Sequence, residues 1–381
     1  MQWLAILIWT AYVVAVFILI RRRLAARRTL SAYNTDSLAD FPSISFIVPA
    51  RNEAANITGC LDALLTQEYP TDKFEILVVD DSSTDATAAL VQNMMTRAPA
   101  IELLSAPALP NDWRGKSHAC WLGARQAQGE WLCFIDADVR LSPGLIAAAV
   151  AEAIESQADM LSLHPHQEMV TFSERFLMPP AFMGLLILMD FDRINNPDSR
   201  AAMANGQFIL IRRDRYQEIG GHRSIKEDVL EDVALARHAK QSGLKLRLLA
   251  GGDLIHTRMY SSASEVWGGL TRGAVELAGG PLFATATIGS SLVLGWLPVL
   301  LPIGVYLTTG FTPVAKTLLF VLAAATSALW YAAMGMILRW YNVPLRYLLL
   351  LPFSFSALSL ATADSLVRTS TGRRVWKDRR L

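Results

Sequence analysis

The chain has 381 residues, enough for two or three domains of roughly 150 residues each. Hydrophobic residues make up 52% of it, a high share for a water-soluble protein, and this predicts membrane segments. The formal net charge of +1 gives no overall basis for binding nucleic acid. The cysteines Cys60, Cys120 and Cys133 stand apart, without metal-ligand spacing, which predicts reduced core residues in a domain that faces the cytosol.

The N-terminal segment is predicted to be a transmembrane anchor over residues 1–20. Its apolar run is nearly uncharged and approaches the roughly 20 residues that a membrane span needs. A basic linker, residues 21–42, comes after the run, whereas a secretory signal carries its charge before the apolar stretch. The positive-inside rule therefore predicts an outside N-terminus and a cytoplasmic location for the chain beyond the cluster Arg21, Arg22, Arg23, Arg27 and Arg28.

From residue 43 onward, apolar strands alternate with segments of helical periodicity. This alternation predicts an α/β fold with a mostly parallel sheet and helices on both faces, as a cytoplasmic domain over 43–280. The predicted strands are 43–48, 74–79, 101–104, 131–135, 206–212 and 245–249, and the predicted helices are 54–65, 85–97, 117–128 and 231–241.

Two predicted strands end in paired carboxylates. Asp136 and Asp138 come after the buried run 131–135, and side chains two residues apart in an extended segment point to the same side. Such a pair suits Mg²⁺ or Mn²⁺, which prefer oxygen ligands and relieve the repulsion between the acids. Asp80 and Asp81 end the strand 74–79, so the two ends together predict a cleft for a charged ligand. The alternative for Asp136 and Asp138 is a turn at the strand end with solvated acids, since Asp is a favoured turn residue.

Further apolar segments predict additional membrane contact. Residues 172–192 are strongly apolar but interrupted by Pro179 and Pro180, which predicts an interfacial segment inside the catalytic domain. A membrane region is predicted over 281–366, with apolar runs at 283–309, 316–337 and 344–366, and a basic tail over 367–381. Three full spans would place that tail outside, so we expect the first run, which contains Pro298 and Pro302, to be kinked or re-entrant and the tail to be cytoplasmic.

An ordered set of short motifs on this framework resembles the inverting family 2 glycosyltransferases, whose nucleotide-sugar-binding domain is called GT-A. The resemblance covers residues 43 to about 275. The flanking membrane segments, the Gly220-Gly221-His222 turn and the Arg258-Met-Tyr260 element are similar to the membrane-bound subset that glycosylates carotenoids, hopanoids and ceramides. The motifs are Pro49-Ala-Arg-Asn-Glu53, Asp80-Asp81, Gly115-Lys116, Asp136-Ala-Asp138 and Glu231-Asp232.

The resemblance implies a role for each residue of the nucleoside end. Pro49, Arg51 and Glu53 would line the nucleoside pocket, and Asp80 and Asp81 would accept hydrogen bonds from the base and the ribose. Taken alone, Pro49 also fits a plain strand terminator, and paired acids after a strand also fit helix capping.

The resemblance also implies how the diphosphate is held. Asp138, assisted by Asp136, would bind the metal ion, while Lys116 would face a phosphate and Arg258 would clamp the diphosphate in a bidentate manner. A solvated loop lysine is the alternative for Lys116.

The acceptor side is expected near the last motif of the set. A sugar-accepting hydroxyl has a very high pKa, so attack needs a carboxylate within hydrogen-bond reach, and Asp232 with Glu231 is the candidate base. The alternative is that both acids simply complement a helix dipole. The other acceptor-side candidates are Gly206, Gln207, Tyr260 and Trp267.

Two further patterns bear on the reaction. The Gln-x-x-Arg-Trp motif of processive synthases is absent where Arg258 and Tyr260 stand, which argues against chain polymerisation. His164 and His166 mimic a metal pair, but the sequence offers no third ligand, so we interpret them as structural or cleft-lining residues.

The expected function is inverting transfer of one sugar from a nucleotide-diphosphate sugar, with UDP expected, to the hydroxyl of a membrane lipid. The expected location is a bacterial-type inner membrane, and the lipid acceptor is expected to enter from the bilayer beside residues 176–189, where Leu185 and Leu186 would face it. The alternatives are a polyprenyl-phosphate acceptor, a processive synthase, a membrane transport component, or a domain that binds nucleotide sugar without turnover.

Overall fold

A computed structural model of the chain describes residues 2–31, 40–373, 375–376 and 379–380. The central part of the linker, residues 32–39, and tail residues 374, 377–378 and 381 lie outside the described residues. The chain forms two compact units. One consists of Arg27–Glu168 and Asp190–Met259, and the other of Met1–Ala26, Met169–Met189 and Tyr260–Leu381. We call the first the sheet unit and the second the helical unit, and each is described by itself.

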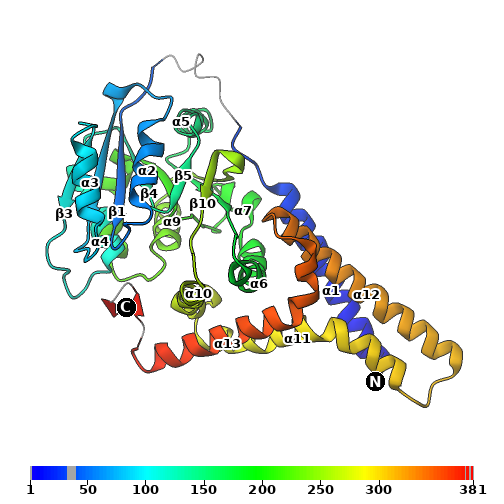
Figure 1. Cartoon of the computed structure of the whole chain (residues 1–381). Helices are drawn as coiled ribbons and strands as arrows, with labels where there is room; N and C mark the ends of the chain where they lie inside the picture. Colours follow the sequence, from blue (N-terminus) through cyan, green and yellow to red (C-terminus); the bar gives the residue numbers. More distant parts are fainter. Residues whose placement is uncertain (1, 32–39, 374, 377–378, 381) are drawn as a thin grey trace. The chain divides into compact units, whose positions relative to one another are not determined.

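The sheet unit is built on a seven-stranded sheet of order β3-β2-β1-β4-β8-β6-β9 (Figure 1). Neighbouring strands run parallel except at β8, which is antiparallel to both β4 and β6. The predicted mostly parallel sheet is therefore confirmed. The strands are β1 (Ile44–Ala50), β2 (Phe74–Asp80), β3 (Ile101–Ser105), β4 (Trp131–Ile135), β6 (Met160–His164), β8 (Phe208–Arg212) and β9 (Leu246–Ala250).

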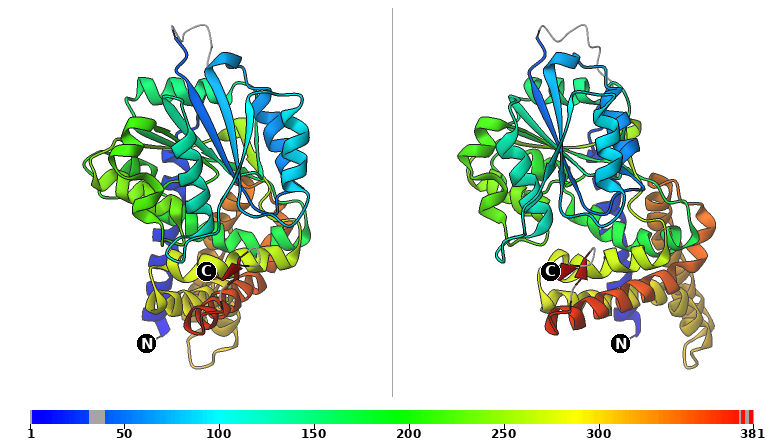
Figure 2. Two further views of the ribbon diagram at one scale, coloured as in Figure 1. Left: turned by 90° about the vertical axis from the view of Figure 1, so that its left-hand side faces the viewer. Right: turned by 60° about the vertical axis from the view of Figure 1, so that its left-hand side comes forward.

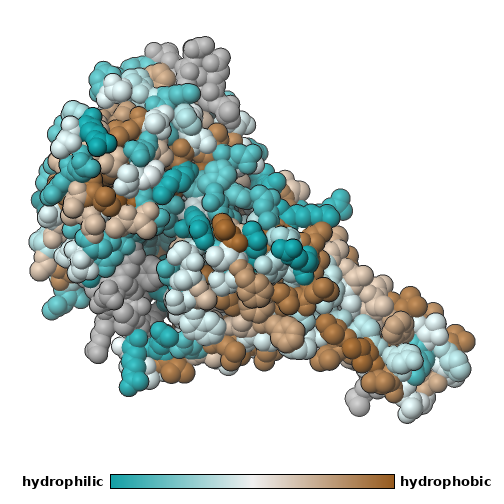
Figure 3. Space-filling view, viewed as in Figure 1, coloured by the Kyte–Doolittle hydropathy of each residue, from teal (hydrophilic) through white to brown (hydrophobic). Residues whose placement is uncertain are grey.

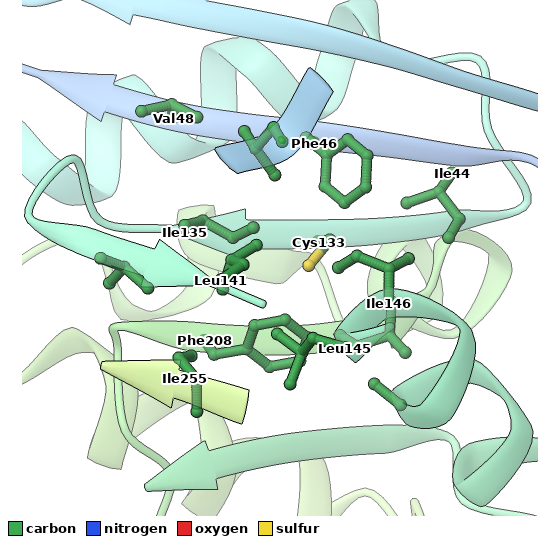
Figure 4. Close-up of a cluster of buried hydrophobic side chains, with 14 of the residues drawn as sticks. Ile44, Phe46, Val48, Cys133, Ile135, Leu141, Leu145, Ile146, Phe208 and Ile255 are labelled. Carbon is green, nitrogen blue, oxygen red and sulfur yellow. The ribbon is translucent and has the colours of Figure 1, made fainter. Parts of the chain in front are cut away.

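One face of this sheet packs against helices α2 (Ile57–Leu65), α3 (Thr87–Met95) and α5 (Leu145–Glu155). Alternate side chains of the strands point to this face because the side-chain period of a strand is two. Figure 4 shows Phe46, Cys133 and Phe208 from three strands meeting Leu145 and Ile146 of α5. The burial of these apolar side chains stabilises the sheet unit and holds the ends of β1 and β4 side by side.

The opposite face carries α4 (Gly115–Gln126), so helices cover the sheet on both sides (Figure 2). A Cβ atom at Gly123 would lie 2.5 Å from Ile47 Cγ2, so glycine allows α4 to lie directly on β1. Farther along this face, Phe134 of β4 packs against Tyr216 and His222. The other helical elements of this unit are α7 (Phe191–Asn195), α8 (Arg213–Glu218), η3 (Gly221–Ile225), α9 (Glu231–Gln241), η2 (Thr71–Lys73) and η4 (Gly252–Leu254).

A second, three-stranded sheet lies in the same unit, in the order β5-β10-β7. Its strands are β5 (Val139–Leu141), β10 (Ile255–Thr257) and β7 (His166–Gln167). Val139 pairs with Thr257, so this sheet begins directly after Asp138 and holds the segment beyond the paired acids. The sequence patterns did not predict β5, β7, β10 or the helix α5.

Within the described residues, the helical unit contains four helices long and apolar enough to cross a membrane, over Trp3–Ala26, Pro281–Leu307, Pro313–Trp340 and Leu345–Ser370. Figure 3 shows apolar side chains gathered along the part of the surface where α11 and α12 lie in Figure 1. The run predicted to be kinked or re-entrant is one helix that continues through Pro298 and Pro302. The helices are α1 (Gln2–Ala26), α6 (Phe172–Leu188), α10 (Ala263–Ala278), α11 (Pro281–Leu307), α12 (Pro313–Trp340) and α13 (Leu351–Ser370), with η5 (Leu345–Leu350), and β11 (Val375–Trp376) pairs with β12 (Arg379–Arg380).

Helix α6 covers most of the segment that the sequence pattern assigned to the catalytic domain as an interfacial stretch. It begins with a capping box of Thr171 and Glu174 and remains helical through both prolines. Phe182 stacks on Tyr341 at 4.5 Å between ring centroids, and Leu186 is fully buried. The segment Met169–Met189 thus belongs to the helical unit, where it packs against the terminal helices.

Candidate active site

A cluster of charged side chains lies where α4 and α9 begin, in the sheet unit. Lys116, in the first turn of α4, places its Nζ 2.7 Å from Asp136 Oδ1 and 2.8 Å from Glu231 Oε1. Asp136 comes directly after β4, and Glu231 is the first residue of α9. We call Lys116, Asp136, Glu231 and Asp232 the lysine–carboxylate cluster. It brings together residues from three of the predicted motifs.

Asp232 is held by backbone donors on both carboxylate oxygens. Gly206 N–H donates to Oδ2 at 2.8 Å, and Val233 N–H donates to Oδ1 at 2.8 Å. A Cβ atom at residue 206 would lie 2.9 Å from Lys116 Nζ and 3.2 Å from Glu231 Oε1, so a side chain there would collide with the cluster. The predicted acceptor-side residue Gly206 therefore allows close approach of the backbone to the carboxylates.

Burial and neighbouring charges shift the pKa values of the cluster. Burial and, to a smaller extent, the neighbouring Glu231 raise the pKa of Asp232 to about 6, while Lys116 and the N–H groups of Gly206 and Val233 oppose the shift. Burial also raises the pKa of Asp136 against the opposing effect of Lys116. The pKa of Lys116 lies well above its usual range, because Asp136 and Glu231 outweigh the burial that would lower it. A carboxylate with a pKa near neutrality is suited to accepting a proton.

Asp138 stands two residues after Asp136, at the start of the small sheet. Its backbone carbonyl accepts a hydrogen bond from Thr257 Oγ1 at 3.3 Å, and Thr257 also accepts one from Gln207 Nε2 at 3.0 Å. Gln207 Oε1 in turn accepts from Gln167 Nε2 at 2.9 Å. All three of these polar side chains are buried, so the network fixes the backbone on which Asp138 stands. Gln207, which was predicted on the acceptor side, thus contacts Thr257, the residue that holds the backbone of the predicted metal ligand Asp138.

Asp136 and Asp138 are the carboxylates of this site that could hold a divalent cation. Among the described residues there is no group of three or more His, Cys, Asp or Glu side chains arranged to hold a metal ion. Mg²⁺ commonly takes only one or two protein carboxylates and fills its remaining positions with substrate phosphates and water. The Asp136–Asp138 pair matches that pattern rather than that of an all-protein metal site.

The residues predicted for the nucleoside end lie together at the ends of β1 and β2, where Ala50 pairs with Asp80. Arg51 Nη1 donates to the Asp81 carbonyl at 2.6 Å, and Glu53 Oε2 accepts from Asn56 Nδ2 at 3.1 Å. The Asp80 carboxylate accepts from Ser83 N–H at 3.3 Å, a hydrogen bond within the turn before α3 rather than the helix cap considered as the alternative. Pro49 lies within β1.

The loops after β1 and β2 are joined by side chains for which the sequence analysis predicted no such link. Asn52 adopts a left-handed φ of 52°, and its Oδ1 accepts from Thr84 N–H at 2.8 Å. Asp85 Oδ2 accepts from Ala54 N–H at 3.0 Å. Polar side chains between two predicted strands were a signal for such a link, since Asn and Asp bond backbone groups readily in loops.

The remaining predicted site residues, Arg258 for the diphosphate and Tyr260 and Trp267 for the acceptor, are divided between the units. Arg258 comes directly after β10 in the sheet unit, whereas Tyr260 and Trp267 belong to the helical unit. Trp267 Nε1 donates to Asp364 Oδ2 at 2.9 Å, and Asp364 also pairs with Arg368. Tyr260 packs against Gly269, where an added Cβ would lie 2.0 Å from its Oη.

Three histidines in the sheet unit differ in their surroundings. His164 is buried, its Nδ1 lies 3.3 Å from Asn205 Nδ2, and burial lowers its pKa to about 4. His166 packs against His256 instead, at 5.4 Å between ring centroids. His222, from the predicted turn, lines a small cavity that Lys116 and Glu231 also line, and its Nδ1 lies 2.8 Å from Tyr216 Oη.

The three cysteines are free and buried. Burial raises the pKa of Cys60 to about 12 and shifts the pKa of Cys133 well above its usual range. Thiols in that state are poor nucleophiles, so the cysteines act as small core residues, as the sequence predicted.

Known proteins resemble this chain in both sequence and fold. Residues 45–220 match the family model "Glycosyl transferase family 2". The chain is 28% identical over 236 residues to the 4,4'-diaponeurosporenoate glycosyltransferases of Staphylococcus aureus strains MRSA252 and USA300, and the match covers 59% of this chain and 60% of theirs. A mannosyltransferase from Pyrobaculum calidifontis, solved with GDP-Man and Mn²⁺, shares the fold with a TM-score of 0.57 at 19% identity, over 97% of this chain and 99% of that one.

Proposed function

This protein carries a glycosyltransferase family 2 domain, and from that premise we propose that it transfers a single sugar, with inversion, from a nucleotide-diphosphate sugar to the hydroxyl of a membrane lipid. The observation that supports the proposal best is Asp232, a half-buried carboxylate that Gly206 N–H and Val233 N–H hold beside Lys116 and Glu231, with a pKa raised to about 6. The named activity of the S. aureus relatives supports a lipid acceptor, and the GDP-Man and Mn²⁺ complex supports a nucleotide-sugar donor and a divalent cation.

The cluster suggests how the chain's own residues would act. Asp232 takes the proton of the acceptor hydroxyl as the oxygen forms its bond to the anomeric carbon of the sugar. The bond from that carbon to the diphosphate breaks, and the nucleoside diphosphate leaves with the electron pair. Attack from the side opposite the leaving group inverts the anomeric configuration.

The leaving group requires positive charge. Lys116 would supply part of it as a point charge, exchanging its contact with Asp136 for a phosphate oxygen. Asp136 and Asp138 would hold a divalent cation, Mg²⁺ or Mn²⁺, which when bound neutralises charge on the diphosphate. One base is sufficient here, because the leaving group needs no protonation by a second carboxylic acid.

The experiment that tests this proposal uses the purified full chain in neutral-lipid nanodiscs. It is incubated with isotope-labelled UDP- and GDP-sugars and a bacterial total lipid extract, and labelled products are identified by mass spectrometry. We expect one sugar per lipid, with a β linkage from an α-linked donor in the NMR spectrum. Labelled polymer, an α-linked product, or no lipid product with any donor would contradict the proposal.

A further inference from the structure

The sheet unit has a second hollow on its surface, formed by different side chains from those of the lysine–carboxylate cluster. Its volume is about 730 Å³, within the range of roughly 300–1,000 Å³ typical of small-molecule sites. We call it the tryptophan pocket. Among the described residues its lining consists of Asp112, Trp113, Trp121, Arg125, Arg223 and Lys226.

Two indole rings form the apolar part of the tryptophan pocket. Trp113 precedes α4 and Trp121 lies within it, and their ring centroids are 5.1 Å apart at an interplanar angle of 39°. Both residues are only partly buried, and both line the pocket. The buried His118 supports Trp113, at 5.2 Å between ring centroids. The two rings thus present a rigid surface suited to a flat or apolar group.

The rest of the lining is mainly cationic. Lys226 forms an ion pair with Asp112, which neutralises one positive charge. Arg125 and Arg223 are exposed, and no ion pair within the described part of the chain engages either guanidinium. A guanidinium binds carboxylate or phosphate through paired hydrogen bonds. The pocket therefore combines a flat apolar surface with an excess of positive charge.

A surface cation–π pair is the simpler explanation for part of this arrangement. Arg125 lies 4.9 Å from the Trp121 ring, four residues away along α4, as such pairs commonly do. That explanation covers neither Trp113, which stands before the helix, nor Arg223, which comes from η3 nearly one hundred residues later. Side chains from three separate segments converge here.

The segments that form the pocket also carry the lysine–carboxylate cluster. Arg114 N–H donates to the Lys226 carbonyl at 2.8 Å, and Arg114 Nε donates to the Glu227 carbonyl at 3.2 Å. Lys116 stands two residues after Arg114, and Glu231 four residues after Glu227. A ligand that contacts Trp113 and Arg223 would therefore touch the two segments of chain that lead to Lys116 and to Glu231.

We propose that the tryptophan pocket is a binding site for an acidic ligand, a phosphate or carboxylate joined to a flat or apolar body, separate from the site of the sugar donor. The indole rings of Trp113 and Trp121 receive the body of the ligand. The guanidinium groups of Arg125 and Arg223 bind its acidic group. Such a ligand can come from a lipid or from a soluble metabolite, because both sources offer this chemistry.

The test measures binding of phenyl phosphate to the purified full chain in neutral-lipid nanodiscs, without any sugar donor. Tryptophan fluorescence reports on the pocket, with Trp121→Phe identifying the share of the signal that arises there. We expect saturable quenching in the wild type, most of which disappears in Trp121→Phe. The double variant Arg125→Gln/Arg223→Gln should bind at least about tenfold more weakly. Arg97→Gln, which removes another exposed arginine at the end of a helix, should bind like the wild type.

Two comparison ligands separate the contribution of the acidic group from that of the ring, and a change of lipid tests the source of the natural ligand. Inorganic phosphate should bind more weakly than phenyl phosphate, and neutral phenyl β-glucoside more weakly still. If the natural ligand is a lipid, anionic phosphatidylglycerol in the nanodiscs should compete with phenyl phosphate. If phenyl phosphate binds equally well in these nanodiscs, the natural ligand is soluble. Either result agrees with the proposal. Equal binding by the double variant, equal binding of phenyl β-glucoside or of inorganic phosphate, or no saturable quenching would overturn it. Because no donor is present, these outcomes do not depend on whether sugar transfer occurs.

Discussion

At the residue scale, Asp232 determines the expected pH dependence. Its pKa of about 6 means that the carboxylate is protonated in more acidic solution, where it can no longer accept a proton. We therefore expect kcat/KM to fall about tenfold per pH unit below pH 6 and to level off above it, measured as lipid-linked sugar formed at several pH values. A flat profile between pH 5 and pH 8 would exclude Asp232 as the base.

The Asp232→Asn variant separates chemistry from binding. An amide lacks the basic oxygen and can accept on one side only, so it satisfies just one of the N–H groups of Gly206 and Val233. We expect transfer to fall by about 10²–10⁴-fold, while nucleotide binding measured by calorimetry stays close to wild type. Loss of both transfer and nucleotide binding would show that Asp232 is needed for the folded structure rather than as the base.

Asp138 carries the expected metal dependence. The network of Gln167, Gln207 and Thr257 fixes the backbone of Asp138. A substitution of its side chain should therefore change the carboxylate without moving the backbone. Asp138→Asn should abolish transfer and remove the Mn²⁺-dependent part of nucleotide binding, since an amide is a neutral and weaker ligand for a hard cation. The matched control is Asp62→Asn, an exposed aspartate of α2. Full activity of the wild type in excess chelator would contradict this assignment.

At the scale of elements, helix α6 shows how tertiary contacts override a local pattern. Pro179 and Pro180 remove backbone donors and usually disrupt a helix, so the sequence predicted a broken interfacial segment. The helix persists because its apolar side chains pack against the terminal helices, as the stacking of Phe182 on Tyr341 shows. Leu186, predicted to face an entering lipid together with Leu185, is instead fully buried within the helical unit.

This burial predicts a difference in stability between two positions of α6. Leu186→Ala should destabilise the helical unit by about 2–5 kcal/mol, because it removes buried methyl groups and leaves a cavity. Leu188→Ala, at a side chain that is 49% exposed, should change stability by less than about 0.5 kcal/mol. The thermal unfolding midpoint of each variant in detergent gives the comparison, and equal midpoints would show that α6 is not part of a packed core.

At the scale of the whole molecule, we propose that the sheet unit lies in the cytoplasm, because the basic residues come after the first apolar helix. The three cysteines are buried, which lowers background labelling by a membrane-impermeant maleimide. A cysteine introduced at the exposed Gln92 of α3 should therefore react in inside-out membrane vesicles but not in intact cells. Labelling in intact cells would place the sheet unit outside.

Much of the sheet unit can be predicted from sequence alone, because its strands are short apolar runs whose periodicity is local. Residues 131–135 and 231–241 were predicted with the bounds of β4 and α9 in the structure. Helix α5 was not predicted, because its residues 145–151 are all buried and show no amphipathic pattern. The strands β5, β7 and β10 have two or three residues each, too few to carry a period.

By itself, the sequence determined the class of the fold, the apolar helices near both ends, and the carboxylates that gather at one edge of the sheet. These features depend on hydrophobic periodicity and on where strands end, which neighbouring residues decide. Only the tertiary structure decided that Lys116 joins Asp136 to Glu231, that Gly206 presents its N–H to Asp232, and that α6 packs among the terminal helices. The residues in each of these contacts are at least 20 positions apart in the sequence, and Lys116 and Glu231 are 115 apart. Long-range packing, rather than local preference, brings such residues together.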